Sequence, residues 1–188
     1  RALRSFERAV ALDPNYARAW AGVAAIVCIE TGDGLMPRAT GLPRLLEAAT
    51  RTVALDPRMA AGHFRLGCYY DLLGEERLAE DHLHKALTLE PDNPQLLGAQ
   101  AGSAAERGRL DEAIDLQRRA VAQDPVSAVF ISNLGHALYA AGRFEEARVE
   151  LLRSDELSPG LNAGTLGQIL VLQHKFEAAL AFIERSAP

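Results

Sequence analysis

Aromatic residues, basic charge and cysteine are all scarce in this sequence of 188 residues. Phe, Trp and Tyr make up 6% of the chain and hydrophobic residues 48%, so Leu, Ala, Val and Ile must fill the core. Such a core favours close-packed helices over a β-sandwich, which prefers β-branched and aromatic residues. The net charge is −5 and no basic stripe is present, so we do not expect this domain to bind nucleic acid.

Long apolar runs and cysteine-rich motifs are also missing. The most continuous apolar stretch, from Ala19 to Ile29, is too short to cross a bilayer and indicates a buried helix, so no membrane contact is expected. The two cysteines, Cys28 and Cys68, have no CxxC or Cys/His spacing that would indicate a metal site. Two reduced thiols in a cytoplasmic protein are the expectation.

Motifs for catalysis and cofactor binding are absent as well. The sequence has no P-loop, G-x-G-x-x-G, G-x-S-x-G or H-E-x-x-H pattern. His82 and His84 lie two residues apart, which on a helix turns them to nearly opposite faces and argues against a zinc pair. We therefore predict no catalytic residue, no cofactor and no metal, and a protein that is not an enzyme.

What the sequence does contain is a repeat. Pro57, Pro91, Pro125 and Pro159 follow one another at intervals of 34 residues. Pro14 stands 43 residues before Pro57, so its unit carries an insertion of nine. Small residues keep the same register at Ala24, Gly67, Ala101 and Gly135, and Gly167 follows two residues early because the last unit is shorter by two. A period of this length indicates a stack of identical helical units, none of which can bury its apolar face alone.

Each unit predicts its own helices. In the stretch 142–157, one face of a helix is marked by residues three and four apart: Phe144, Ala147, Leu151, Ser154 and Leu157. The glycine before this stretch ends the preceding helix at little cost, because glycine enters the left-handed region freely. The proline after it stops the helix, since it lacks an N–H and restricts the residue before it.

These features together resemble the tetratricopeptide repeat (TPR) family, whose period of 34 carries W-x2-L-G-x2-Y, then A-x3-F, then P. Matches to the first element are Trp20, Val23 and Ala24; Leu66, Gly67 and Tyr70; and Leu134, Gly135 and Leu138. Ala2 with Phe6 matches the second. The resemblance implies an all-α fold, a right-handed superhelical solenoid of antiparallel helix pairs.

The repeat divides the chain into a single array of eleven predicted helices. Residues 1–14 form the second helix of a truncated unit, residues 15–57 a unit with an inserted loop at 30–43, and residues 160–188 a final, shortened unit. The full units are 58–91, 92–125 and 126–159. The chain starts on an arginine halfway through a unit and ends without a polar capping helix, which indicates a fragment of a longer protein.

The TPR resemblance also implies a concave groove, lined by the first helix of each pair, that takes a peptide or a partner protein. Projecting that face predicts ten partner-binding residues: Arg18, Phe64, Arg65, Cys68, Asp71, Gln95, Asn133, His136, Tyr139 and Gln168. The strongest local cluster is predicted to combine residues of two first helices: Phe64, Arg65 and Asp71 beside Asn133, His136 and Tyr139. Aromatic and arginine side chains are typical binding anchors. Packing of Phe64 and Tyr139 between repeats is the alternative.

Two groove chemistries of the family find little support. Ala21 and Ala25 stand where a two-carboxylate clamp for an acidic C-terminus would need lysine and asparagine, and Gly98 leaves the next wall bare. Receptors that hold a peptide backbone with groove asparagines would here have only Asn133. The inserted loop is a second candidate for partner contact, through Leu35 and Met36, beside the alternative of a tolerated surface insertion.

The sequence predicts a non-enzymatic, cytoplasmic scaffold that binds a protein or peptide. Three alternatives remain open: a regulatory domain of a longer bacterial signal-transduction protein, a docking arm of a multidomain enzyme, and a homo-oligomer assembled through uncapped ends. The first rests on a finer resemblance. The strings LDPNYARAWAGVA, LPRLLEAATRTVALDP and FEAALAFIERSAP are similar to the C-terminal TPR region of bacterial cyclase or winged-helix regulators.

Overall fold

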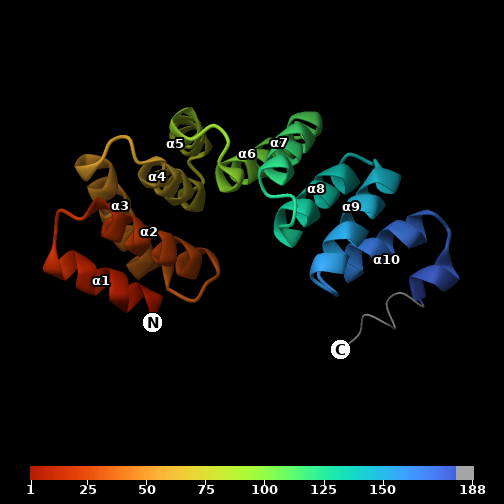
Figure 1. Ribbon diagram of the computed structural model, residues 1–188, viewed down its shortest axis with the longest axis horizontal. Helices are drawn as coiled ribbons and strands as arrows, with labels where there is room; N and C mark the ends of the chain where they lie inside the picture. The colour runs from red at the N-terminus through yellow and green to blue at the C-terminus, as the bar shows by residue number, and fades with distance from the viewer. Residues whose placement is uncertain (181–188) are drawn as a thin grey trace. The chain divides into compact units, whose positions relative to one another are not determined.

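Helices make up the fold in the computed structural model, which describes residues 1–180 (Figure 1). Ten are complete within those residues: α1 Ala2–Leu12, α2 Ala17–Gly32, α3 Arg38–Leu55, α4 Ala60–Leu73, α5 Glu76–Leu89, α6 Pro94–Glu106, α7 Leu110–Gln123, α8 Ala128–Ala140, α9 Phe144–Leu157 and α10 Ala163–Leu172. Residues 176–180 are also helical, and no strand occurs in the described part of the chain. The predicted all-α array of helix pairs is confirmed; the end of the predicted final unit, 181–188, lies outside the described residues.

The chain divides into two compact units, Arg1–Pro91 and Asp92–Pro188, each taken here by itself. In unit 1 the pairs α2–α3 and α4–α5 pack side by side, with α1 lying on α2. Its core has small and branched residues: Val23, Ala24, Val27, Leu45, Ala48, Ala49 and Leu66. The Phe6 ring of α1 lies against Gly22, where any side chain would collide with it. Glycine at this place lets α1 close onto the first pair.

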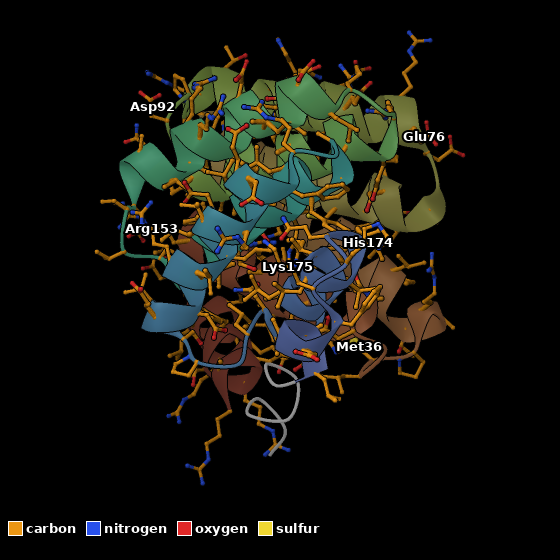
Figure 2. All side chains as sticks on the ribbon, turned by 90° about the vertical axis from the view of Figure 1, so that its right-hand side faces the viewer. Met36, Glu76, Asp92, Arg153, His174 and Lys175 are labelled. Carbon is orange, nitrogen blue, oxygen red and sulfur yellow. The ribbon has the colours of Figure 1, made fainter. Side chains whose placement is uncertain are left out.

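Unit 2 repeats the arrangement with α6–α7 and α8–α9, followed by α10. The buried side chains around α8 form its core: Ile114, Val121, Ile131, Leu134, Leu138, Leu151, Leu166 and Ile169. Polar contacts also link the helices of unit 2 at its surface. Arg153 donates to the carbonyl oxygen of Pro125 at 2.7 Å, and Asp92 lies 3.6 Å from Arg119. Figure 2 labels Arg153 and Asp92 among the side chains. Within unit 2, neighbouring helices therefore contact each other along both their apolar and their polar edges.

The prolines end the helices as the 34-residue period predicts. The second helices α1, α3, α5, α7 and α9 each stop two residues before a proline of the series. The residue between leaves the helical region in every case, for example Asp56 at φ −141°, because a following proline disfavours that region. The turns inside three pairs use Gly74, Gly108 and Gly142 at φ between 74° and 76°, a left-handed conformation that glycine adopts without strain.

The predicted loop at 30–43 is wrong in extent. Helix α2 runs to Gly32 and α3 already begins at Arg38, with Pro43 inside it. The proline is tolerated because it is exposed near the start of the helix, where its missing N–H leaves only the carbonyl of an exposed residue, Ala39, to bond to water. Gly41 lets the two helices meet, since a side chain there would collide with the buried Thr31.

The insertion is therefore absorbed as longer helices and a short link at 33–37. Of the two residues predicted to contact a partner from this loop, Met36 packs against the core of unit 1. Leu35 is 77% exposed and stays available at the tip. Across the described residues, no helix is both long enough and apolar enough to span a bilayer.

Candidate functional site

A pocket of about 290 Å³ lies in unit 2 between the first helices α6 and α8. Helix α6 supplies one wall, α8 the opposite wall, and a single side chain of α7 completes the lining. The residues around it are Gly98, Ala101, Gly102, Ala105, Gln117, Asn133, His136, Ala137 and Ala140. Alanine and glycine predominate, so the hollow results from small side chains rather than from separated helices.

Two of the lining glycines have no packing reason to be glycine. Gly98 and Gly102 are one turn apart on α6, and a Cβ atom added at either would meet no atom within 4 Å. Gly135 on α8 differs, because a Cβ there would lie 2.6 Å from the Leu151 side chain. The glycine at position 135 is thus required by the helix contact, whereas those at 98 and 102 leave open space above the helix.

Gln117 lies at the edge of this pocket with an unsatisfied amide. The residue is 5% exposed, and its Oε1 atom has no hydrogen-bond partner in the described part of the chain. It belongs to the buried stripe of α7, whose other members are Ala113, Ile114, Leu116, Ala120 and Val121. Our projection of the first helices did not reach Gln117, because it lies on a second helix. A glutamine inside an otherwise apolar helical stripe was the available signal.

The α8 side of the pocket carries two of the predicted residues, Asn133 and His136. The Nε2 atom of His136 lies 3.1 Å from the Thr165 hydroxyl of α10, and burial lowers the pKa of this imidazole below its ordinary value. His136 is therefore uncharged at neutral pH. One turn further, the Tyr139 hydroxyl donates to the side-chain amide oxygen of Gln168 at 3.3 Å. Predicted residues 139 and 168 thus bond to each other and join α8 to α10.

The predicted residues of unit 1 gather around Arg65 on α4. Its guanidinium carbon lies 4.6 Å from the centre of the Phe64 ring, within cation–π range. Its positive charge also acts to lower the pKa of the thiols of Cys28 on α2 and Cys68 on α4. The carboxylate of exposed Asp71 acts on the Cys28 thiol, whose pKa it raises. The four residues predicted from α4 therefore share one neighbourhood, to which α2 adds Cys28.

The two thiols have opposite electrostatic environments. A hydrogen bond from Cys68 lowers the pKa of Cys28 to about 7, against the effect of burial and with help from Arg65. The same hydrogen bond raises the pKa of Cys68, and burial raises it further. Cys28 is thus the more reactive thiol, because the thiolate is the nucleophile. Both are free cysteines, as the sequence predicted.

Two predicted residues stand apart from these groups. Arg18 is exposed in the first turn of α2. Gln95 is exposed at the start of α6, where its backbone N–H donates to the Asn93 side chain, the helix cap. The lining of the α6–α8 pocket does not include it. The clusters around residues 65 and 136 belong to different units.

His82 takes part in a contact that the sequence did not indicate. It turns toward α4, where its Nδ1 atom lies 3.3 Å from that of His63. Its ring also stacks on Tyr70 with centroids 5.5 Å apart. His84 is exposed, as expected for a residue on another face. Among the described residues, no group of three His, Cys, Asp or Glu side chains is arranged to hold a metal ion.

Two tetratricopeptide repeat family models match the middle of the chain, one at residues 104–162 and the other at residues 73–128. Residues 73–162 thus carry tetratricopeptide repeats. Repeats of this family generally serve as non-enzymatic modules for protein–protein interaction, and the fold of this chain is that of such a scaffold. The matched ranges include both walls of the α6–α8 pocket.

The chain also resembles a known protein in sequence and solved structures in fold. Small glutamine-rich tetratricopeptide repeat-containing protein 2 of Mycosarcoma maydis is 35% identical over 75 residues, which is 40% of this chain and 21% of that protein. This TPR chain thus spans about a fifth of that relative. The APC/C hetero-tetramer Cut9–Hcn1 gives a TM-score of 0.77 at 20% identity, covering 99% of this chain and 39% of that one.

A second solved structure covers nearly its full length. YrrB, described as a TPR protein with an unusual peptide-binding site, gives a TM-score of 0.65 at 20% identity, covering 98% of this chain and 92% of that one. At 20% identity, these two structural similarities support the TPR fold of this chain but do not indicate which ligand it binds.

Proposed function

We propose that this TPR array is a non-enzymatic scaffold that binds a peptide segment of a partner protein in the α6–α8 pocket of unit 2. The observation that carries the proposal is the pair Gly98 and Gly102, which line the pocket although nothing around them requires a glycine. The open volume of about 290 Å³ can admit a side chain of the partner together with part of its backbone.

The two glycines that leave this space lower the stability of helix α6. Glycine in a helix interior is less stable than alanine by roughly 0.5–1 kcal/mol, since it loses more backbone freedom on folding. Both glycines lie within α6, away from its ends. No packing contact requires a glycine at either position, because an added Cβ would meet open space. Room for a ligand accounts for both residues at once.

The lining has the character of a recognition pocket. Its walls are mainly apolar, and three polar side chains, Gln117, Asn133 and His136, face the same hollow. Ligand sites in proteins combine apolar walls with a few polar groups that fix orientation. The prediction that Asn133 and His136 contact a partner is consistent with this arrangement.

The test fills the pocket without disturbing the fold. Random heptapeptides displayed on phage are selected on the immobilised chain, and the dissociation constants of the enriched peptides are measured. The double substitution Gly98→Leu and Gly102→Leu should fold normally and weaken binding at least tenfold. Gly164→Leu is the matched control, because Gly164 is also exposed with open space around it but lies outside the lining.

Unchanged affinity in the filled variant, or no selected peptide at all, would contradict the proposal. Peptides that survive filling would direct attention to unit 1, where Phe64 and Arg65 form a cation–π pair typical of a binding anchor. Arg65→Glu and Tyr139→Ala, measured separately, then assign binding to unit 1 or to unit 2. No contact among the described residues favours a regulatory domain, a docking arm or self-assembly over peptide binding.

A further inference from the structure

We infer that the α6–α8 pocket selects an uncharged carboxamide, the side chain of an Asn or Gln in the bound segment, and that Gln117 is the residue that recognises it. The inference rests on the proposed function and specifies its ligand chemistry. It starts from Oε1 of Gln117, an acceptor that is buried and unpaired in the described part of the chain.

An unpaired buried amide is costly, and the stripe around it offers no reason to keep it. Every other buried residue of α7 is Ala, Ile, Leu or Val, and an apolar side chain of similar size would pack at position 117 without leaving a polar atom unsatisfied. Gln117 also lines the pocket, so rotation of its carboxamide would bring this buried acceptor within reach of an entering ligand, which then supplies the missing hydrogen bond. The ligand must therefore bring a donor to this acceptor.

The donor is uncharged because nothing in the lining would balance a charge. The residues around the pocket include no Asp, Glu, Lys or Arg. His136, the one titratable residue, is kept neutral at pH 7 by burial, which lowers its pKa. An ammonium or guanidinium group entering such a site would lose its hydration without gaining a counter-ion. A carboxylate would likewise enter without a counter-ion, and its oxygens could bond to the N–H donors of Gln117 but not to the unpaired Oε1.

A carboxamide fits better than a hydroxyl. It carries N–H donors and a carbonyl acceptor on one planar group, as Gln117 does, so two amides can exchange a pair of hydrogen bonds in either orientation. Gly98 and Gly102 leave space through which an Asn or Gln side chain of the ligand can enter between α6 and α8. Asn133 lines the same pocket from α8, so its amide would be available to bond the backbone of the same segment.

The experiment uses the full chain and the heptapeptide display described above. Peptides selected by the unsubstituted chain should be enriched in Asn or Gln at one position. For a synthetic copy of the best peptide, replacing that residue by Leu or Asp should weaken binding to the unsubstituted chain at least tenfold. This comparison needs no protein variant and so is independent of folding.

Substitutions at position 117 complete the test. Gln117→Leu should bind the Asn or Gln peptide at least tenfold more weakly, while Gln117→Glu should shift the selection toward Lys or Arg at the same position. Gln123→Leu, at an exposed site on the same helix, is the control and should change neither result.

The outcomes separate the two proposals. Peptides that lack Asn and Gln, bind with unchanged affinity to Gln117→Leu and are blocked by the Gly98 and Gly102 substitutions would overturn the carboxamide inference and leave the proposed function standing. Asn- or Gln-containing peptides whose affinity is unchanged by Gln117→Leu would also overturn it. Failure of the unsubstituted chain to select any peptide would overturn both.

Discussion

The imidazoles of His63 and His82 meet across the α4–α5 pair with their Nδ1 atoms 3.3 Å apart, half-buried and stacked. One ring must donate a hydrogen and the other accept it, so the contact requires that at least one of them be neutral. Burial lowers the pKa of both imidazoles, and the ammonium of Lys85 lowers both further. The pair is thus a charge-sensitive contact inside unit 1.

This pair predicts acid sensitivity. Because both pKa values are lower in the folded state, the unfolded chain binds more protons once the pH falls below the ordinary histidine pKa. The stabilisation is complete above that value and is lost as the pH falls through the lowered ones. His82→Phe keeps a ring beside Tyr70 and should flatten the decline in melting temperature between pH 7 and pH 5. An equal decline in His82→Phe and in the exposed control His84→Phe would contradict this origin.

Cys28 should be the first thiol to be alkylated. With a pKa of about 7, roughly half of it is thiolate at neutral pH. Its labelling by iodoacetamide, followed by peptide mass spectrometry, should become half-maximal near that pH and outpace labelling of Cys68. Cys68→Ala removes the hydrogen bond that stabilises the thiolate, so the midpoint should move upward. An unmoved midpoint would show that Cys68 does not set the Cys28 pKa.

Gly135 should tolerate no side chain. A Cβ atom there would lie 2.6 Å from Leu151 Cγ and 3.3 Å from its backbone nitrogen, so α8 and α9 would have to separate. We expect Gly135→Leu to reduce the free energy of unfolding by about 1–3 kcal/mol, the usual cost of overpacking. Urea unfolding measures it. Gly102→Leu on the open side of α6 is the control and should leave stability unchanged or raise it.

Asn162 should be a stability residue, not a binding residue. It is 2% exposed, accepts a hydrogen bond from Ser132 at 2.6 Å and donates to the carbonyl oxygen of Leu151 at 3.3 Å. Asn162→Leu leaves both partners unsatisfied, so we expect a loss of about 1–3 kcal/mol in urea unfolding. The half-buried Asn133→Leu should cost under about 0.5 kcal/mol, as is usual for substitutions away from such networks. Equal losses of unfolding free energy in Asn162→Leu and Asn133→Leu would contradict this assignment of Asn162 to stability.

The sequence predicted the helices well because their ends depend on local chemistry. A proline stops each second helix whatever lies around it, and Gly74, Gly108 and Gly142 turn the chain inside three pairs. Pro43 misled the same reasoning. Whether a proline ends a helix depends on its distance from the start and on whether the freed carbonyl reaches water, and both became visible only in the structure.

The candidate site was predictable only in part. The helical register placed Asn133 and His136 on the pocket side of α8, since one face of a helix follows from spacing alone. It gave no warning that Tyr139 bonds to Gln168, because that contact depends on how two helices pack. Gln117 was missed for the same reason: a second helix contributes it to a space between two first helices.

The lengthened α2–α3 pair shows where this architecture accepts new sequence. Nine additional residues extend the two helices and their link, while the spacing of all four later prolines stays at 34. The tip of a helical hairpin is thus a place where evolution, or a protein engineer, can graft a segment without resetting the remaining repeats. The exposed link around Gly34 and Leu35 is the natural insertion point for a reporter or an epitope in this chain.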